Sequence, residues 1–176
     1  QKPPGRRGEQ WLAPREEVDA RVDASFEKYN VVAFFGDPSH TLDDETMDRY
    51  WDPLFEKWHL KYKNRVRIWA SGTKGGKGHA VMFDMTDRAN TKAIGEAVGF
   101  TLEEIRSQSF TWDGDPRLRR HVLNARRYPV ASGVVSIAKD RRDSKNKIDL
   151  AVCMVGARMV RRRVLNSTAN KGGRVW

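Results

Sequence analysis

The sequence predicts an α/β domain in which a mixed sheet is flanked by helices. First, an amphipathic helix runs directly into residues 31–35, an apolar stretch with no polar face, which is typical of a central strand covered by helices on both sides. Second, shorter strand-like runs follow at residues 66–70 and 80–85. Third, a strand that ends at Ile137 leads through a charged loop into another amphipathic helix.

Proline positions set the expected helix boundaries in the first half of the chain. After an opening segment rich in proline and glycine, Pro14 fits the first turn of a helix that ends near Tyr29. Residues 42–63 are predicted to be helical, with Pro53 kinking or breaking the helix. The apolar residues expected on the inner face of the first helix are Val18, Val22, Phe26 and Tyr29.

Two more helices are predicted between the strands. Residues 87–107 have a helical pattern that Gly95 and Gly99 interrupt, which predicts one broken helix or two. Asp115 is expected to cap a helix that begins at Pro116. The residues expected on the buried side of that helix are Leu118, Val122 and Ala125.

The last helix is predicted to begin near Lys147 and to carry a chemically interesting acid. Asp149 lies in its first turn, where a carboxylate faces the positive end of the helix dipole. It is either a favourable first-turn acid or a metal-binding carboxylate. Cys153 reads as a small core residue. The apolar residues expected to pack inward are Ile148, Val152, Val155 and Met159.

The charge of the chain favours an anionic partner. The net charge is +10, and 14 of the 33 Lys and Arg residues lie between Arg117 and Arg163, where there are only three acids. A basic surface confined to one part of a chain is typical of nucleic-acid binding, although a solvated face is the alternative. No apolar run is long enough to span a bilayer, and no signal peptide opens the chain.

The candidate chemistry is metal-dependent phosphodiester hydrolysis. Asp37 directly follows the predicted buried strand, so it is either a turn residue before proline or a ligand at the carboxyl end of the sheet. Thiol, zinc and serine chemistry lack the required partners, and His121 reads as a partly buried structural residue. Carboxylates inside a basic field suit Mg²⁺ or Mn²⁺, with Asp37 and Asp149 as ligands and Asp143 as a possible accessory ligand. The candidate phosphate contacts are Lys139, Arg141, Arg142, Lys145, Lys147, Arg120 and Arg127.

Several stretches resemble a known family. These are residues 11–37, 119–127, 137–139 and 144–149, together with Gly133. They resemble the C-terminal nuclease domain of the large terminase subunits of tailed bacteriophages. The resemblance implies a ribonuclease H-like fold over residues 1–165, with a flexible tail at 166–176.

The resemblance also implies a function. Asp37 and Asp149 fall on the family's second and third metal-binding acids, and the activity is that of a divalent-metal DNA endonuclease. Such an enzyme cuts concatemeric double-stranded DNA during genome packaging, at the procapsid in the host cytoplasm. The implied partners are DNA, the portal, the small terminase subunit and the ATPase domain of the same protein.

The sequence departs from this family at its first catalytic aspartate. The family places that residue on an opening strand, which is absent here, so we expect a partial nuclease domain that holds at most one ion, binds DNA and cuts it poorly. Two alternatives are open. One is another ribonuclease H-like nuclease, such as a junction resolvase or a transposase core. The other is a non-catalytic DNA-binding or assembly module.

Overall fold

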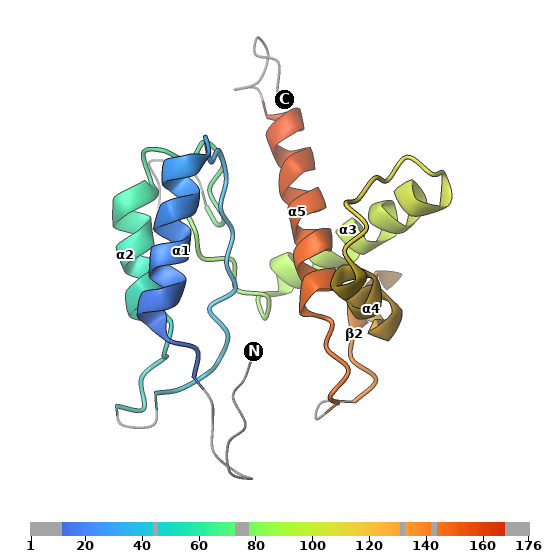
Figure 1. Cartoon of the computed structure of the whole chain (residues 1–176), viewed down its shortest axis with the longest axis horizontal. Coiled ribbons are helices and arrows are strands. Elements are labelled where there is room, and N and C mark those ends of the chain that lie inside the picture. The colour runs from blue at the N-terminus through green and yellow to red at the C-terminus, as the bar shows by residue number, and fades with distance from the viewer. Residues whose placement is uncertain (1–11, 44–45, 73–77, 131–132, 142–143, 168–176) are drawn as a thin grey trace.

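The computed structural model describes residues 12–43, 46–72, 78–130, 133–141 and 144–167. Within these ranges the chain is mixed α/β, with five helices and one antiparallel pair of strands. In chain order the elements are α1 (Arg15–Lys28), α2 (Asp52–Tyr62), α3 (Arg88–Arg106), α4 (Pro116–Asn124), β1 (Arg126–Pro129), β2 (Val135–Ala138) and α5 (Asp149–Asn166). Figure 1 shows α1 and α2 side by side, and α5 with α3, α4 and β2 on the other side of the molecule.

Extended segments lie between these two groups of helices. The alternation of side chains along residues 31–36 sends neighbouring aromatics to opposite faces. Phe34 packs against the cluster formed with α1 and α2, whereas Phe35 packs against the cluster formed with α3 and α5. The predicted coverage of this segment by helices on both faces is therefore confirmed.

The regular sheet expected from the sequence is much smaller in the described residues. Ala33 pairs with Ile68 and Gly36 with Met82, each as an isolated parallel bridge, and an antiparallel bridge joins Ser71 to His79. Residues 31–36 are half-buried rather than fully buried. Apolar composition predicted the position of these segments correctly and overestimated their pairing.

Helices α1 and α2 are tied together by both rings and charges. Asp19 of α1 accepts a hydrogen bond from the indole Nε1 of Trp58 at 2.9 Å. Asp23 accepts hydrogen bonds from Tyr62 and from Lys61 of α2. The predicted span of α1 and the inward packing of Val18, Val22 and Phe26 are confirmed, whereas Tyr29 is exposed at the end of the helix. The prediction of a helix over 42–63 is wrong before Asp52, since Pro53 occupies the first turn of α2, where its missing N–H costs nothing.

Helix α3 is continuous, which corrects the expectation of a break. Asp87 caps it, accepting hydrogen bonds from the backbone N–H groups of Ala89 and Asn90. Gly95 is needed for close packing, because a Cβ there would lie 2.3 Å from Cγ1 of Val134. Its presence reflects the approach of the hairpin to the helix and not a helix end.

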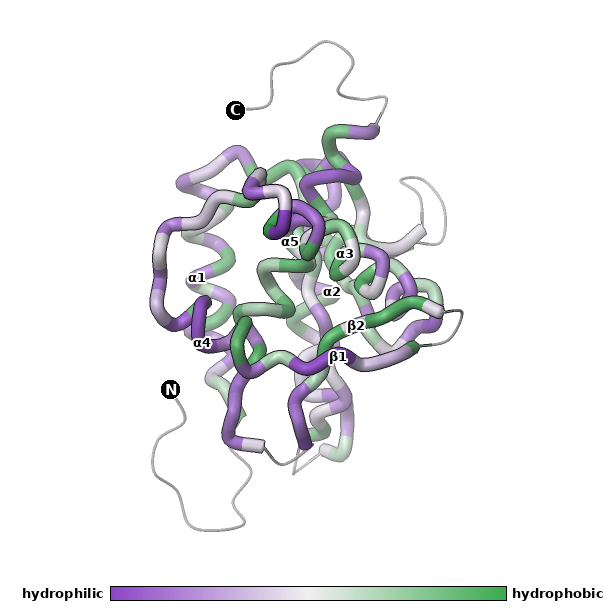
Figure 2. The backbone as a smooth tube through the Cα atoms, turned by 90° about the vertical axis from the view of Figure 1, so that its right-hand side faces the viewer, coloured by the Kyte–Doolittle hydropathy of each residue, from purple (hydrophilic) through white to green (hydrophobic). Residues whose placement is uncertain are grey.

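The hairpin, α4 and α5 form the basic end of the chain. Strand β1 pairs with β2 from Arg126 opposite Ala138 to Pro129 opposite Val135, and this strand was not predicted from the sequence. Figure 2 shows hydrophilic residues along β1 and apolar residues along β2 and much of α5. Asp115 caps α4 as predicted. No residue of α4 is fully buried, so the predicted burial of its apolar side is only partial.

Helix α5 begins two residues later than predicted and packs as expected on its inner face. Ile148, Val155 and Met159 are buried. Cys153 is exposed, contrary to its assignment to the core, and lies beside a pocket whose walls cover part of its side chain. Among the helices of the described chain, none has the length and apolar character needed to cross a bilayer.

Candidate functional site

Asp37 is held at the end of a paired backbone segment. The N–H of Gly36 donates to the carbonyl of Val81 at 2.9 Å, and the carbonyl of Gly36 accepts from the N–H of Phe83 at 2.8 Å. A Cβ at Gly36 would lie 2.8 Å from Cζ of Phe55, so glycine permits this close approach. The Asp37 side chain is exposed beyond this point, and its Oδ1 accepts one hydrogen bond, from the N–H of Met85 at 3.1 Å.

Asp149 is the first residue of α5, and α4 holds the start of that helix in place. Nδ1 of His121 accepts a hydrogen bond from the N–H of Leu150 at 3.0 Å. Nδ2 of Asn124 donates to the carbonyl of Lys147 at 3.0 Å. His121 thus satisfies one of the free N–H groups at the helix start. The expectation of a partly buried structural histidine is confirmed.

Of the two candidate carboxylates, Asp37 lines a pocket against α5 and Asp149 does not. Asp37 lines a pocket of about 400 Å³ together with Phe35 and Phe83. The opposite wall is formed by α5, starting with Val152 and Cys153. Asp149 stands one helical turn before these two residues, at the same end of α5. The fold therefore brings Asp37 to a pocket walled by α5, and the pocket begins one helical turn after Asp149.

The pKa of the Cys153 thiol depends on the negative charge at this end of α5. Burial against the surrounding chain raises the pKa of its thiol, and the negative charge of Asp149 raises that pKa further. Asp149 is one turn away, at the spacing where helix side chains are neighbours. Sequence reasoning missed Cys153 as part of this region because it counted the thiol as core.

The basic loop before α5 is mainly solvent-exposed. Arg141, Lys145 and Lys147 are exposed and Lys139 is half-buried. None of these four forms an ion pair with a carboxylate in the part of the chain that the structure describes. The two remaining candidates of this loop, Arg142 and Asp143, lie outside the described residues.

Asp140 has a structural role inside the same loop. A hydrogen bond from the Ser144 side chain lowers the pKa of Asp140, with a further contribution from the N–H of Arg141. The N–H of Ser144 also donates to the carbonyl of Arg141 at 3.1 Å. The acid therefore organises the turn and leaves the basic side chains unpaired.

The two basic candidates outside the loop are placed differently. Arg120 is exposed on α4, one turn before Asn124, so it lies on the face that contacts the start of α5. Arg127 lies on β1 opposite Ile137 and lines a different pocket, between the hairpin and α3. Arg120 therefore belongs with the loop, whereas Arg127 belongs to the second pocket.

Two other acids, Asp84 and Asp115, have structural roles. Asp84 accepts hydrogen bonds from the side chain and backbone of Thr86, which lower its pKa. Asp115 pairs with Arg117, and the hydrogen bond from that guanidinium lowers the pKa of Asp115 to about 2. Both carboxylates accept hydrogen bonds from residues close to them in sequence, in a turn at Asp84 and at the helix cap at Asp115.

The described structure contains no preformed metal centre. The described residues contain no group of three His, Cys, Asp or Glu side chains that could hold a metal ion. Asp37 and Asp149 nevertheless supply the hard oxygen atoms that Mg²⁺ and Mn²⁺ prefer. Mg²⁺ commonly binds through one or two carboxylates plus substrate phosphates, so a site of that kind needs fewer than three protein ligands.

Two curated bacteriophage proteins are similar to this chain. The Gene 13 protein of Mycobacterium phage L5 is 35% identical over 163 residues. The Gene 13 protein of Mycobacterium phage D29 is also 35% identical over 163 residues. Each alignment covers 92% of this chain and 24% of the relative, so the chain spans about a quarter of the length of these proteins. No family model matches the chain, and no solved structure matches it significantly.

Proposed function

We propose that this chain is a divalent-metal-dependent DNA endonuclease domain with a ribonuclease H-like fold, from the large terminase subunit of a tailed bacteriophage. The observation that carries the proposal is that Asp37 lines a pocket whose opposite wall is α5 from Val152 onwards, one helical turn after Asp149. The phage origin of the similar proteins supports the same proposal.

Each carboxylate is available for an ion. Neither Asp37 nor Asp149 forms an ion pair with a residue in the described ranges. Asp37 uses Oδ1 to accept from Met85, which leaves Oδ2 for a metal ligand. When Mg²⁺ or Mn²⁺ is bound, it supplies activation of water and stabilisation of the leaving oxygen.

The basic residues would hold the DNA backbone beside these acids. Arg141, Lys145 and Lys147 are exposed on the loop that leads into Asp149, and Arg120 lies on the neighbouring face of α4. Contacts of this kind neutralise phosphates and carry no sequence information. The remaining partners under this proposal are the portal, the small terminase subunit and the ATPase domain, acting at the procapsid in the host cytoplasm.

Plasmid nicking in the presence of Mn²⁺ tests the catalytic part. The expected result is weak nicking that needs Mn²⁺ and is lost in Asp37→Asn and in Asp149→Asn. Glu17→Gln is the matched control, since Glu17 is an exposed acid on α1 with no proposed role. Nicking that survives Asp149→Asn would place the active site elsewhere.

DNA affinity measured with Mn²⁺ and with EDTA separates the nuclease from its main rival. A metal shared between carboxylates and phosphate predicts tighter binding with Mn²⁺, and loss of that gain in Asp37→Asn. If the affinity is the same with Mn²⁺ and with EDTA and no nicking occurs, the nuclease assignment is refuted. The chain would then be a non-catalytic DNA-binding or assembly module.

A further inference from the structure

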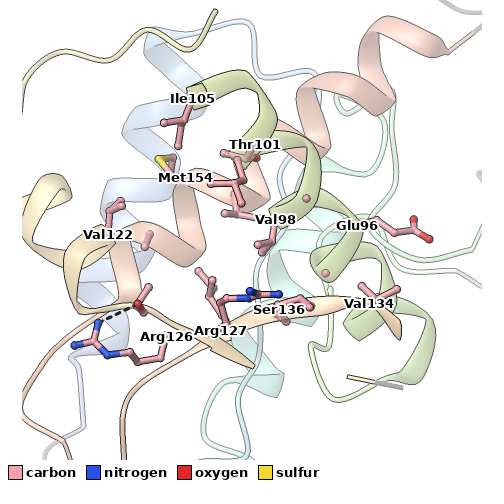
Figure 3. A pocket seen from close by; sticks show the side chains of 18 of the residues that line it. Glu96, Val98, Thr101, Ile105, Val122, Arg126, Arg127, Val134, Ser136 and Met154 are labelled. Atoms are coloured by element: carbon pink, nitrogen blue, oxygen red, sulfur yellow. Dashed lines mark hydrogen bonds between the residues drawn. The ribbon is translucent and has the colours of Figure 1, made fainter. Parts of the chain in front are cut away.

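A second pocket, of about 590 Å³, lies on the opposite side of α5 from the candidate site. It is bounded by α3, α4, the β1–β2 hairpin and the first turns of α5. Figure 3 shows Ile105, Met154 and Val122 around the same hollow, with Arg126 and Arg127 on the hairpin at its lower edge. None of the residues proposed to bind metal lines it.

The walls of this pocket are apolar and incompletely covered. Leu102 is 43% exposed, Ile105 42% and Val122 36%. Large apolar side chains gathered at a hollow in this way mark a surface that another apolar group covers. Thr101 is buried in the same wall, and its hydroxyl has no hydrogen-bond partner in the described structure.

The rim of the pocket is positively charged. Arg106, Arg126 and Arg127 line it, and none of them pairs with a carboxylate within the described ranges. Arg126 donates instead to two carbonyls near the C-terminal end of α4. The one acid of the lining, Glu96, is turned away towards Lys92, to which it is joined at 3.7 Å (Figure 3).

The length of the pocket suits a short helix. Its lining runs along α3 from Gly95 to Arg106, which at 1.5 Å per residue corresponds to about 16 Å, or three turns. Helices that dock in grooves present apolar anchors at positions i, i+3 or i+4 and i+7, and three turns accommodate such a set. The strand edge is a poorer docking site, because Pro129 removes a backbone donor from β1.

We propose that this pocket is a docking site for an acidic amphipathic helix of a protein partner. The apolar face of that helix covers Leu102, Ile105 and Val122, and its flanking Asp or Glu side chains pair with Arg106 and Arg127. Charge complementarity selects an acidic helix over a basic one. The proposal is independent of the nuclease activity.

Synthetic peptides of about 15 residues provide the probe. The first has Leu at helical spacing with Glu at the flanking positions, the second carries Lys in place of Glu, and the third carries Ala in place of Leu. Fluorescence anisotropy measures their affinity for the whole chain. The acidic Leu peptide is expected to bind, and the Lys and Ala peptides are expected to bind at least about tenfold more weakly, which is about 1.4 kcal/mol.

Gly99 allows the pocket to be filled without disturbing the fold. It lies in α3, lines the pocket, and a Cβ there would meet nothing within 4 Å. Gly99→Leu is expected to fold at least as well as the parent and to lose binding of the acidic peptide about tenfold or more. Unchanged binding by a folded Gly99→Leu protein would overturn the proposal.

Charge reversal gives a second test that does not depend on filling the pocket. Arg106 is exposed, so Arg106→Glu should fold normally, weaken the acidic peptide about two- to fivefold and strengthen the Lys peptide. Arg21→Glu on α1 is the matched control and should change neither affinity. Equal binding of the acidic and Lys peptides would overturn the proposal. Self-association that Gly99→Leu abolishes would also overturn it, by assigning the pocket to a second copy of the chain.

Discussion

Gly95 and Gly99 form a matched pair for testing how the hairpin packs on α3. Both lie inside the helix, where replacing glycine by alanine is intrinsically favourable by about 1 kcal/mol. Their surroundings differ. A Cβ at Gly99 meets nothing within 4 Å, whereas a Cβ at Gly95 would lie 2.3 Å from Cγ1 of Val134.

Val134 has little freedom to move away from a new methyl group. It is β-branched, and its carbonyl accepts a hydrogen bond from the N–H of Val130 at 2.9 Å, which fixes the end of the hairpin. Overpacking of this kind costs about 1–3 kcal/mol. The cost opposes the propensity gain, so Gly95→Ala should be neutral to about 2 kcal/mol destabilising, while Gly99→Ala should stabilise by about 1 kcal/mol.

Thermal unfolding followed by circular dichroism measures both effects. For a chain of this size, 1 kcal/mol corresponds to about 2–4 °C in Tm, so the two variants should differ by several degrees with opposite signs. Val134→Ala should remove most of the penalty of Gly95→Ala. An equal rise in Tm for Gly95→Ala and Gly99→Ala would refute the placement of the hairpin against α3.

Three further predictions follow from individual contacts. Burial and the nearby His59 lower the pKa of His79 below its value in the unfolded chain. The contribution of His79 to the free energy of unfolding should therefore be complete above about pH 6.5 and should fall as the pH drops through that value. Unfolding midpoints between pH 7 and 5 measure this, and His79→Gln should flatten their dependence on pH. His121→Ala should cost about 1 kcal/mol through loss of the cap on α5, and a calorimetric Tm equal to that of the parent would contradict this role. The charge of Asp149 raises the pKa of Cys153, so Asp149→Asn should speed alkylation of that thiol at neutral pH about threefold. This factor follows from a Coulomb energy near 0.7 kcal/mol for two charges about 6 Å apart in water. An unchanged rate of alkylation would show that Asp149 does not influence the Cys153 thiol.

The sequence predicted the helices well wherever a capping residue or a proline marks the start of the helix. Pro14 before α1 and Asp115 before α4 each mark a start that the structure confirms. The inner face of α5 also follows from spacing alone, as the burial of Val155 and Met159 confirms. These features depend on residues within a turn or two of one another, which is the range over which sequence patterns carry information.

The errors arose where a distant segment decides the outcome. Gly95 indicated a helix break, yet it is present because Val134, nearly forty residues later, packs against it. The extent of strand pairing at residues 31–36 depends on two partner segments, and apolar composition cannot specify how many residues pair. Pro53 fitted both a kink and a helix start, and only the path of the preceding residues selects between them.

The sequence indicated which residues could form the candidate site, but it did not indicate how they are arranged in space. Asp37 and Asp149 were selected because each follows or begins an element that packs inward; Asp37 lines the pocket against α5, and Asp149 lies one turn before that wall. The positioning roles of His121 and Asn124 were missed, since their partners lie 29 and 23 residues away. The helix that precedes another in the chain could be searched for such side chains, because helix starts leave N–H groups to satisfy.

Helix α5 links the two proposed sites, because alternate faces of the same turns form the walls of both pockets. Val152, Cys153 and Gly156 face the pocket of Asp37, while Met154 and Val155 line the pocket beside α3. A helix moves largely as a rigid body, so an occupant that shifts α5 at one pocket would also move Asp149 relative to Asp37. Alkylation of Cys153 reports on this directly. If binding of the acidic peptide changes the rate of alkylation, and Gly99→Leu abolishes that change, the two pockets are coupled through α5.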